Sequence, residues 1–338
     1  MLEMLKELCA IDGVSGDEGK VCDYIASFSR QYADEVTIDA MGNVLVYKKG
    51  AKTPKKRVVL CAHMDEVGLV VTYITDDGYL KFDMAGYIDE RIILGKAVSV
   101  GKSGAVGVIG CKPAYMVSPE NLNKPIPIGE LYIDVGAKNR EEAMKIVRPG
   151  DTCAFETDIR EFGDGYIKAK AIDDRFGCTA LLELIKSNLP IDCMFVFTAQ
   201  EEVGARGAVT AAYSTAPDIA VIVEGTSAAD LPSSQGNKKV CKLGEGVVIP
   251  FMDGGAIYDK EIFKILTCTA EKNGIPWQTK TYVAGVTDAS VFQRSRSGIK
   301  VAGIAAPICN LHSQSCVGKI SDMEDVVRLL KMFLAELG

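Results

Sequence analysis

Apolar and polar residues alternate along the chain with two different periods, and the change of period separates helices from strands. Residues 2–8 carry leucines three positions apart among charged residues, which predicts an amphipathic surface helix. Ser15 is followed three positions later by Glu18, a capping-box pattern that predicts the start of a second helix running to about Arg30. We therefore expect the N-terminal region to consist of two helices.

Short apolar runs bounded by turn residues follow and predict β-strands. Residues 36–50 predict a hairpin that turns near Gly42, and the β-branched run 57–63 predicts a buried strand. From residue 68 to residue 165, short strands and turns succeed one another, and EEAMKIV (141–147) is the one segment with a helical period. We therefore expect residues 68–165 to form a small all-β barrel domain inserted into a second domain.

Helices and strands alternate again after the expected insertion. Residues 175–188 and 205–213 show a helical period, whereas residues 192–200 and 217–225 are apolar runs of strand length. This alternation predicts an α/β domain whose mostly parallel sheet carries helices on its faces. The α/β domain, which we expect to be catalytic, would comprise two stretches of chain, residues 1–67 and 166–338.

The composition argues against several classes of protein. The 338 residues carry a formal charge of −7 and no basic cluster beyond Lys55–Arg57, which argues against nucleic-acid binding. No apolar run approaches the roughly 18 residues that span a bilayer, and the N-terminus lacks the basic-then-apolar order of a signal peptide. We therefore expect no membrane contact and a cytoplasmic location. Eleven cysteines without a CxxC array are expected to be free thiols there.

The chain contains only two histidines, and both lie where an apolar run meets a polar loop. His63 ends the run RVVLCAH, at the kind of strand end where open parallel sheets bind ligands. Asp65 follows two positions later and could orient the imidazole, as carboxylates beside metal-bound histidines do. His312 follows the run VAGIAAPIC. A lone histidine is more often a core residue, but the strand-end position of His63 and its Asp65 partner favour metal binding.

Acidic residues stand in similar places in three other segments. Asp173 and Asp174 precede a helix, where they are either a helix cap with its neighbour or a charge pair neutralised by a cation. Glu201 and Glu202 follow a strand, either as a solvated pair or as a metal ligand beside a residue that faces metal-activated water. A third strand is expected to end at Glu224. Two histidines with several carboxylates suit zinc, cobalt or manganese.

Six motifs occur in the order found in one known family. They span nearly the whole chain: GVSGDE, AHMDEVG, AIDDRFG, QEEVGARG, GVTDAS and a final His-Ser pair. In this order they resemble the tetrahedral, or TET-type, aminopeptidases, which include glutamyl and deblocking aminopeptidases and relatives once labelled endoglucanases. The resemblance implies an α/β/α sandwich with a mixed, zinc-peptidase-like sheet, an inserted β domain used for dimerisation, and a homo-oligomer that extends to a tetrahedral dodecamer.

The resemblance also implies roles for individual residues. Two divalent metal ions per subunit, zinc or cobalt with manganese as a further candidate, would have five ligands: His63, Asp173, Glu202, Glu224 and His312. Asp173 would bridge both ions, and its peptide bond to Asp174 is expected to be cis. Glu201 becomes the general base that takes a proton from a bridging water, and Asp65 becomes the partner of His63.

Two departures from the family pattern concern the site. The family usually has Asp where this chain has Glu224, which keeps the carboxylate but lengthens its reach. The last histidine of the family commonly follows an Arg-Tyr-Ile stretch, whereas Cys309, Asn310 and Leu311 precede His312 here. Metal preference and substrate choice are therefore left open by the resemblance.

The expected function is that of a metal-dependent aminopeptidase that removes N-terminal residues from short peptides through a two-metal-activated water. The same centre would also suit an N-acyl amino acid deacylase or a carboxypeptidase, and the fold could serve as a non-catalytic assembly scaffold. A glycosidase needs two carboxyls on opposite sides of the scissile bond, about 5 to 9.5 Å apart. The adjacent Glu201 and Glu202 are poor candidates for that arrangement.

Overall fold

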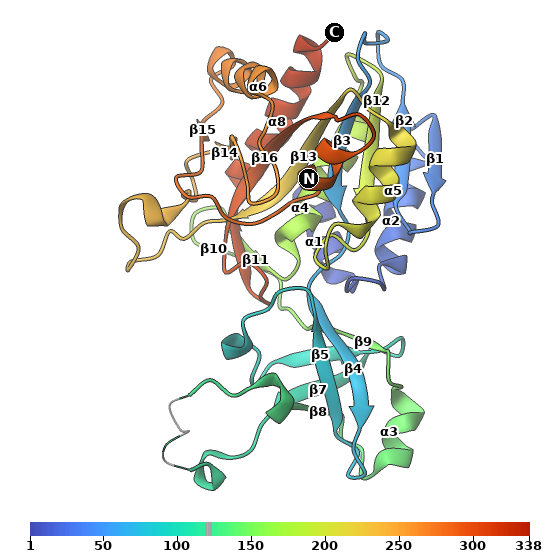
Figure 1. Cartoon of the computed structure of the whole chain (residues 1–338), viewed down its shortest axis with the longest axis vertical. Coiled ribbons are helices and arrows are strands. Elements are labelled where there is room, and N and C mark those ends of the chain that lie inside the picture. The colour runs from blue at the N-terminus through green and yellow to red at the C-terminus, as the bar shows by residue number, and fades with distance from the viewer. Residues whose placement is uncertain (119, 121–123) are drawn as a thin grey trace.

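The chain folds into a sheet covered by helices on both faces, with a β-barrel attached at one end (Figure 1). The computed structural model describes residues 1–118, 120 and 124–338. The predicted fold class, an α/β/α sandwich with a mixed sheet and a small all-β barrel, is confirmed. The chain leaves the sandwich for the barrel after β3 and returns to it before β10, so the sheet is discontinuous in sequence.

The large sheet contains eleven strands within the described residues. Its main path runs in the order β1 (Glu35–Ile38), β2 (Val44–Lys48), β12 (Cys193–Thr198), β3 (Val58–His63), β13 (Ile219–Ser227), β16 (Lys300–Cys309), β17 (Cys316–Lys319), β11 (Tyr166–Ala169) and β10 (Arg160–Phe162). Two short strands, β14 (Val247–Val248) and β15 (Trp277–Gln278), join it beside β16. Strands β12, β3, β13 and β16 pair in parallel and form the centre. The expected hairpin is β1–β2.

Helices cover both faces of this sheet. One face carries α1 (Leu2–Ala10), α2 (Gly19–Ser29), α4 (Ile172–Lys186), α6 (Lys260–Lys272) and α8 (Ile320–Glu336), and the other carries α5 (Arg206–Thr215) and α7 (Ala289–Arg294). Strand β3 shows why both faces are apolar. Val58, Leu60 and Ala62 pack with the first group, whereas Val59 and Cys61 pack with the second. Successive side chains of a strand point to opposite faces, so a buried central strand must be apolar throughout.

The second helix begins differently from the capping-box prediction. It starts at Gly19, and no side chain caps it. Ser15 Oγ donates instead to Asp65 Oδ2 at 2.6 Å, and Glu18 Oε1 accepts from the Gln200 N–H at 3.0 Å. The capping-box prediction is therefore wrong, because both side chains are used to hold the loops that follow β3 and β12.

The barrel is closed by six antiparallel strands. Their order is β4 (Gly68–Ile74), β5 (Leu80–Ala85), β8 (Tyr132–Asp134), β7 (Ala105–Gly110), β6 (Ala97–Val100) and β9 (Thr152–Phe155). The helix α3 (Arg140–Ile146) precedes β9, and short 3₁₀ helices occur at Glu90–Ile92, Ala114–Met116, Ile128–Glu130 and, in the sandwich, Gly236–Lys239. The barrel has its own apolar core, in which Leu69, Leu80 and Ile133 are fully buried.

Strand β10 belongs to the sheet and not to the barrel. It pairs with β11, and β11 pairs with β17, whereas the last barrel strand ends at Phe155. The sequence placed every strand up to residue 165 in the insertion, so the placement of β10 was wrong. A three-residue strand carries no local signal of the sheet it joins, because cross-strand packing decides its pairing.

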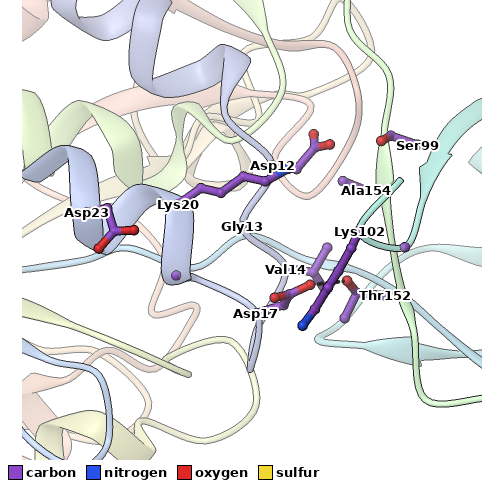
Figure 2. A pocket seen from close by; sticks show the side chains of 12 residues that line it. Asp12, Gly13, Val14, Asp17, Lys20, Asp23, Ser99, Lys102, Thr152 and Ala154 are labelled. Carbon is purple, nitrogen blue, oxygen red and sulfur yellow. Dashed lines mark hydrogen bonds between the residues drawn. The ribbon is translucent and has the colours of Figure 1, made fainter. Parts of the chain in front are cut away.

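A cavity of about 330 Å³ lies where the barrel meets the N-terminal segment (Figure 2). Ser99, Lys102 and Thr152 line it from the barrel, and Asp12 and Asp17 line it from the sandwich. Thr152 Oγ1 donates to Asp17 Oδ2 at 2.8 Å and so ties the barrel to the segment before α2. The two histidines do not line this cavity, so it is separate from the predicted metal site.

All eleven cysteines are free thiols, as expected, and most of them are buried. Within the described residues, no helix combines the length and apolar character needed to cross a bilayer.

Candidate metal centre

The structure brings the predicted site residues together at one edge of the sheet. Thr198, near the end of β12, is the register partner of His63, so the loop after β12 lies beside that histidine. Glu224 lies within β13, which continues to Ser227, and not at the strand end predicted for it. Carboxyl ends of parallel strands meet at one edge of a sheet. The residues that meet there are His63, Asp65, Asp173, Glu201, Glu202, Glu224 and His312.

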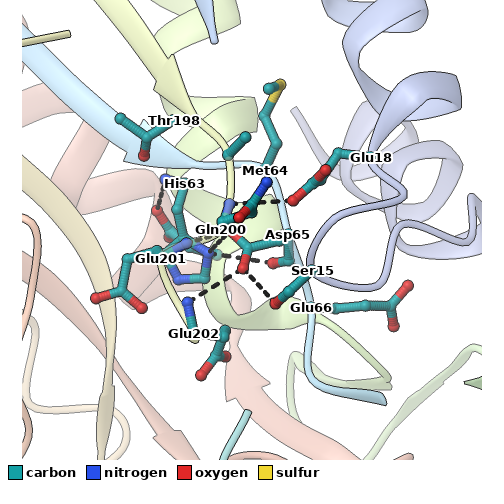
Figure 3. A network of polar contacts seen from close by, with 12 residues as sticks. Ser15, Glu18, His63, Met64, Asp65, Glu66, Thr198, Gln200, Glu201 and Glu202 are labelled. Carbon is teal, nitrogen blue, oxygen red and sulfur yellow. Dashed lines mark hydrogen bonds and ion pairs between the residues drawn. The ribbon is translucent and has the colours of Figure 1, made fainter. Parts of the chain in front are cut away.

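Asp65 is a fully buried carboxylate that organises the loops of the site (Figure 3). Its Oδ1 accepts from the Glu201 N–H at 2.9 Å, and its Oδ2 accepts from the Glu202 N–H at 3.1 Å. Ser15 Oγ also donates to Oδ2. Burial acts to raise the pKa of Asp65, but hydrogen bonds and the charge of His63 lower it below its usual value. Asp65 therefore connects three segments that are distant in sequence.

The imidazole of His63 is held so that one ring nitrogen faces the centre. Nδ1 lies 3.1 Å from the backbone oxygen of Asp65 and 3.4 Å from its Oδ1. Nε2 lies 3.6 Å from both Asp173 Oδ1 and Glu224 Oε2. Burial acts to lower the pKa of His63, but the charge of Glu224 and the contacts with Asp173 and Asp65 raise it well above its usual value. Nε2 is therefore the atom available to a metal.

Asp173 lies between the two histidines. Its Oδ1 faces His63, and its Oδ2 lies 3.8 Å from the Nε2 of His312. The same Nε2 lies 3.3 Å from Glu202 Oε2. His63 therefore contacts Asp173 and Glu224, His312 contacts Asp173 and Glu202, and Asp173 is common to both. Ligand atoms of His63, Asp173 and Glu202 also lie within 4.8 Å of one another.

Asp174 supports the backbone of the site. Its Oδ2 accepts from the His63 N–H at 3.2 Å, and its Oδ1 accepts from the Gly177 N–H at 2.9 Å. The peptide bond between Asp173 and Asp174 is cis, as the resemblance implies. Ligand atoms of His63, Asp174 and Glu224 also lie within 4.8 Å of one another, but both oxygens of Asp174 already accept from N–H groups. Asp173 is therefore the better ligand.

The spacing of these atoms suits divalent metal ions. Two ligand atoms that each lie about 2.1 Å from one zinc ion at a tetrahedral angle are about 3.4 Å apart. The separations around His63 and His312, from 3.3 to 3.8 Å, are of this size. Asp173 Oδ1 and Glu224 Oε1 are buried and have no hydrogen-bond partner among the residues that the structure describes. A buried carboxylate oxygen without a partner costs stability unless a cation binds it.

The negative charge of the site also favours the binding of cations. No lysine or arginine in the described part of the chain forms an ion pair with its six acidic side chains, Asp65, Asp173, Asp174, Glu201, Glu202 and Glu224. Burial and the charges of neighbouring carboxylates raise the pKa values of Asp174, Glu202 and Glu224 well above the usual range. Bound cations would offset this repulsion, so the residues present fit a metal centre.

Glu201 differs from the other carboxylates of the centre. Within the described structure its carboxylate forms no hydrogen bond. Its backbone N–H donates to Asp65 Oδ1, and this bond positions the residue. Burial raises the pKa of Glu201 to about 8. The charge of His63 acts to lower this pKa, whereas the charges of Asp288 and Asp65 act to raise it. A carboxyl group whose pKa is raised by burial is suited to accept a proton and return it.

Two acidic residues outside the predicted set support the centre. Asp288, in the GVTDAS motif, is fully buried and accepts from Thr198 Oγ1 at 2.5 Å. Glu66, in the AHMDEVG motif, accepts from Lys170 Nζ and from the Gly13 N–H, both at 3.0 Å. Both residues lie inside motifs that carry the resemblance. An acidic residue in such a motif, next to apolar neighbours, is the sequence signal that could have identified them.

Comparison with known proteins points to peptidases. The family model described as M42 glutamyl aminopeptidase matches residues 42–329. A curated relative is the lysyl aminopeptidase of Pyrococcus furiosus, which is 32% identical over 99% of this chain and 97% of that protein.

Solved structures agree with this family match. The aminopeptidase APDkam598 from the archaeon Desulfurococcus kamchatkensis has a TM-score of 0.93 and 35% identity, and the match covers 99% of this chain and 94% of that one. The TET1 peptidase of Pyrococcus horikoshii, which can assemble into a tetrahedron or a large octahedral shell, has a TM-score of 0.88 and 35% identity over 98% of both chains.

Proposed function

The chain belongs to the M42 glutamyl aminopeptidase family, and we propose that it is a metal-dependent aminopeptidase that removes N-terminal residues from short peptides. The family match confirms the resemblance read from the six motifs. The observation that carries the proposal is the position of Asp173, whose two oxygens face two different histidines.

We assign the metal ligands to two overlapping sets. His63, Asp173 and Glu224 would hold one divalent cation, and His312, Asp173 and Glu202 would hold the other. Zinc or cobalt suits this mixture of nitrogen and oxygen ligands, and manganese is a further candidate. When bound, such ions supply Lewis acidity toward a carbonyl group and lower the pKa of water.

The remaining residues of the centre would move and position a proton. Glu201 accepts the proton of the attacking water and passes it to the amine that leaves when the peptide bond breaks. Asp65 is a positioning residue, because it holds the backbone of Glu201 and the ring of His63 at the same time. Asp174 positions the backbone N–H of His63.

The charge of the centre supports action at the amino terminus of a peptide. Two divalent cations balance only part of the charge of six acidic side chains when these are ionised. A protonated amino terminus is therefore attracted to the site, whereas the terminal carboxylate required by a carboxypeptidase is repelled.

Assembly and location are proposed on separate grounds. The barrel exposes Val106 and Val108 side by side on β7. Because the chain is similar to a TET1 peptidase that can assemble into a tetrahedron, we propose that the barrel joins subunits into dimers and that dimers build a dodecamer. Eleven free thiols support the cytosol as the compartment in which the protein works.

Hydrolysis of matched peptides tests the proposed function. Metal-free protein would be supplied with zinc, cobalt or manganese and assayed on aminoacyl anilides and on the same short peptides with a free or an N-acetylated amino terminus. Added metal should restore cleavage of the free-amine substrates only. Glu201→Gln should lower kcat by at least about 100-fold, the usual contribution of a general base, with the metals still bound.

A matched variant and two outcomes complete this test. Glu245→Gln, which changes an exposed glutamate paired with Lys242, should leave the rates unchanged. Cleavage of N-acetylated substrates instead of free ones would indicate a deacylase. Binding of two metals without cleavage of any substrate would indicate the assembly scaffold.

A further inference from the structure

A large cavity adjoins the candidate metal centre between the barrel and the sandwich. A small cavity of about 10 Å³, lined by Asp173, Glu202 and His312 together with Phe155 and Ser313, has room for about one water-sized group. A second cavity of about 500 Å³ shares Phe155 and Ser313 with it. The larger cavity has the size of sites that hold small ligands, and the two residues common to both linings place it next to the centre.

The larger cavity contains one positive charge that has no partner in the described part of the chain. Asp89 and Arg91 line it but pair with each other, with an Nη2–Oδ2 distance of 2.5 Å. Lys96, which precedes β6, is half-buried, and its ammonium group forms no hydrogen bond or ion pair within the described structure. The described lining therefore carries a net charge of +1, from one acidic and two basic side chains. A half-buried ammonium group gains most from an anionic ligand.

Asn310 supplies a second donor from the sandwich side of the same cavity. It is one of the residues at which the chain departs from the family pattern before His312, and it lines the larger cavity. Its side-chain amide forms no hydrogen bond within the described structure, so its N–H groups are available to a ligand. The departure thus changes the lining of the cavity that Lys96 also lines.

We propose that Lys96 binds a carboxylate on the leaving part of the substrate, the C-terminal carboxylate of a short peptide being the source that fits best. This inference rests on the proposed function and names its substrate class more narrowly. The acidic centre attracts the amino terminus, and Lys96 with Asn310 attracts the opposite charge in the neighbouring cavity. Short peptides with two free ends match both charges.

Steady-state kinetics of the metal-loaded, full-length protein test this proposal. The substrates are Leu-Gly-Gly and its C-terminal amide, together with Leu-Glu-amide and Leu-Gln-amide, which present the carboxylate on a side chain instead. Lys96→Met should raise KM for Leu-Gly-Gly by roughly tenfold, the loss expected for one charge-assisted contact, with kcat within about twofold. KM for the amide should not change, and Lys96→Arg should restore the wild-type preference.

The controls separate this proposal from the proposed function. Lys102→Met removes an exposed lysine of the same barrel that lines the other cavity, and it should leave all four KM values unchanged. A loss that appears with Leu-Glu-amide and not with Leu-Gly-Gly supports the carboxylate site but assigns it to an acidic side chain. Equal KM values for acid and amide in the wild type, or an equal effect of Lys96→Met on both, overturn the inference while leaving the aminopeptidase intact. A wild-type protein that cleaves no peptide overturns both.

Discussion

Asp173 is the residue on which both halves of the candidate metal centre depend. Its Oδ1 faces His63, its Oδ2 faces His312, and Oδ1 is buried without a hydrogen-bond partner. Glu224 contacts only the His63 half, through Oε2. The two acidic residues should therefore differ in how many metal ions they retain.

Removal of each carboxylate should change the metal content by a different amount. The wild type should retain two divalent ions per chain after dialysis, Glu224→Ala about one, and Asp173→Ala fewer than one. Loss of a hydrogen-bond partner of a ligand weakens metal affinity by roughly 10- to 100-fold. Loss of a direct ligand should weaken metal affinity by more than this. Metal analysis by mass spectrometry with zinc titration measures both quantities.

Two control variants, one at an exposed residue and one conservative, test whether these metal contents report the loss of a ligand. Glu245→Ala, on the surface, should still retain two ions. Glu224→Asp should recover the second ion, because it restores the carboxylate usual in the family. Retention of two ions by Asp173→Ala would contradict the shared-ligand assignment.

Between elements, buried polar contacts hold together the segments that carry the site. Arg175, near the start of α4, is fully buried. Its Nε donates to the backbone oxygen of Met64 at 2.8 Å, and its Nη1 donates to those of Leu8 at 2.6 Å and Ile11 at 3.0 Å. One side chain thus connects α1, the loop after β3 and α4. This connection fixes the histidine strand relative to the helix that begins at the two aspartates.

Arg175→Met should lower the stability of the protein strongly. The substitution leaves three backbone oxygens without this donor, each worth about 1 kcal/mol or more when buried, so the free energy of unfolding should fall by at least about 3 kcal/mol. Urea unfolding followed by circular dichroism measures the change. Arg160→Met, at an exposed arginine of β10 paired with Asp158, should stay within about 0.5 kcal/mol of the wild type. Equal stability of both variants would contradict the connecting role of Arg175.

At the scale of the whole molecule, two surfaces of the barrel matter. One joins the barrel to the sandwich, and the other faces outward. Its junction with the sandwich frames the cavities next to the site, while β7 on the outside exposes Val106 at 59% and Val108 at 47%. Both valines point away from the barrel core, because Gly107 and Ile109 between and after them point inward. An exposed pair of valines on one strand is a candidate contact between subunits.

Replacing both valines should therefore break the assembly without unfolding the chain. Val106→Lys with Val108→Lys should shift the particle in light scattering coupled to gel filtration toward the 36.3 kDa of one chain, because buried charges oppose association. Val209→Lys on α5, at a valine exposed to 54%, should leave the particle mass unchanged. A double variant with the wild-type mass would exclude this face of the barrel.

Local patterns in the sequence were sufficient for the fold class and the family, and they suggested which residues have metal-binding chemistry. The alternation of helical and strand periods predicted the α/β/α sandwich and the barrel, because each period states which residues share a face. The ordered motifs identified the family, whereas the roles of His63, Asp173 and His312 stay predictions. The fold class and the family could be predicted because residue type and near-neighbour spacing are local properties of a chain.

Contacts between distant segments decided the rest. Ser15 and Glu18 have the spacing of a helix cap, yet they bind the loops after β3 and β12, and β10 joins the large sheet instead of the barrel. Likewise, Asp174 holds a backbone N–H, and Lys96 faces a cavity whose other wall is more than two hundred residues away in sequence. A hydroxyl, a carboxylate or a strand edge can satisfy several partners, and only the folded chain determines which of them comes within hydrogen-bonding distance.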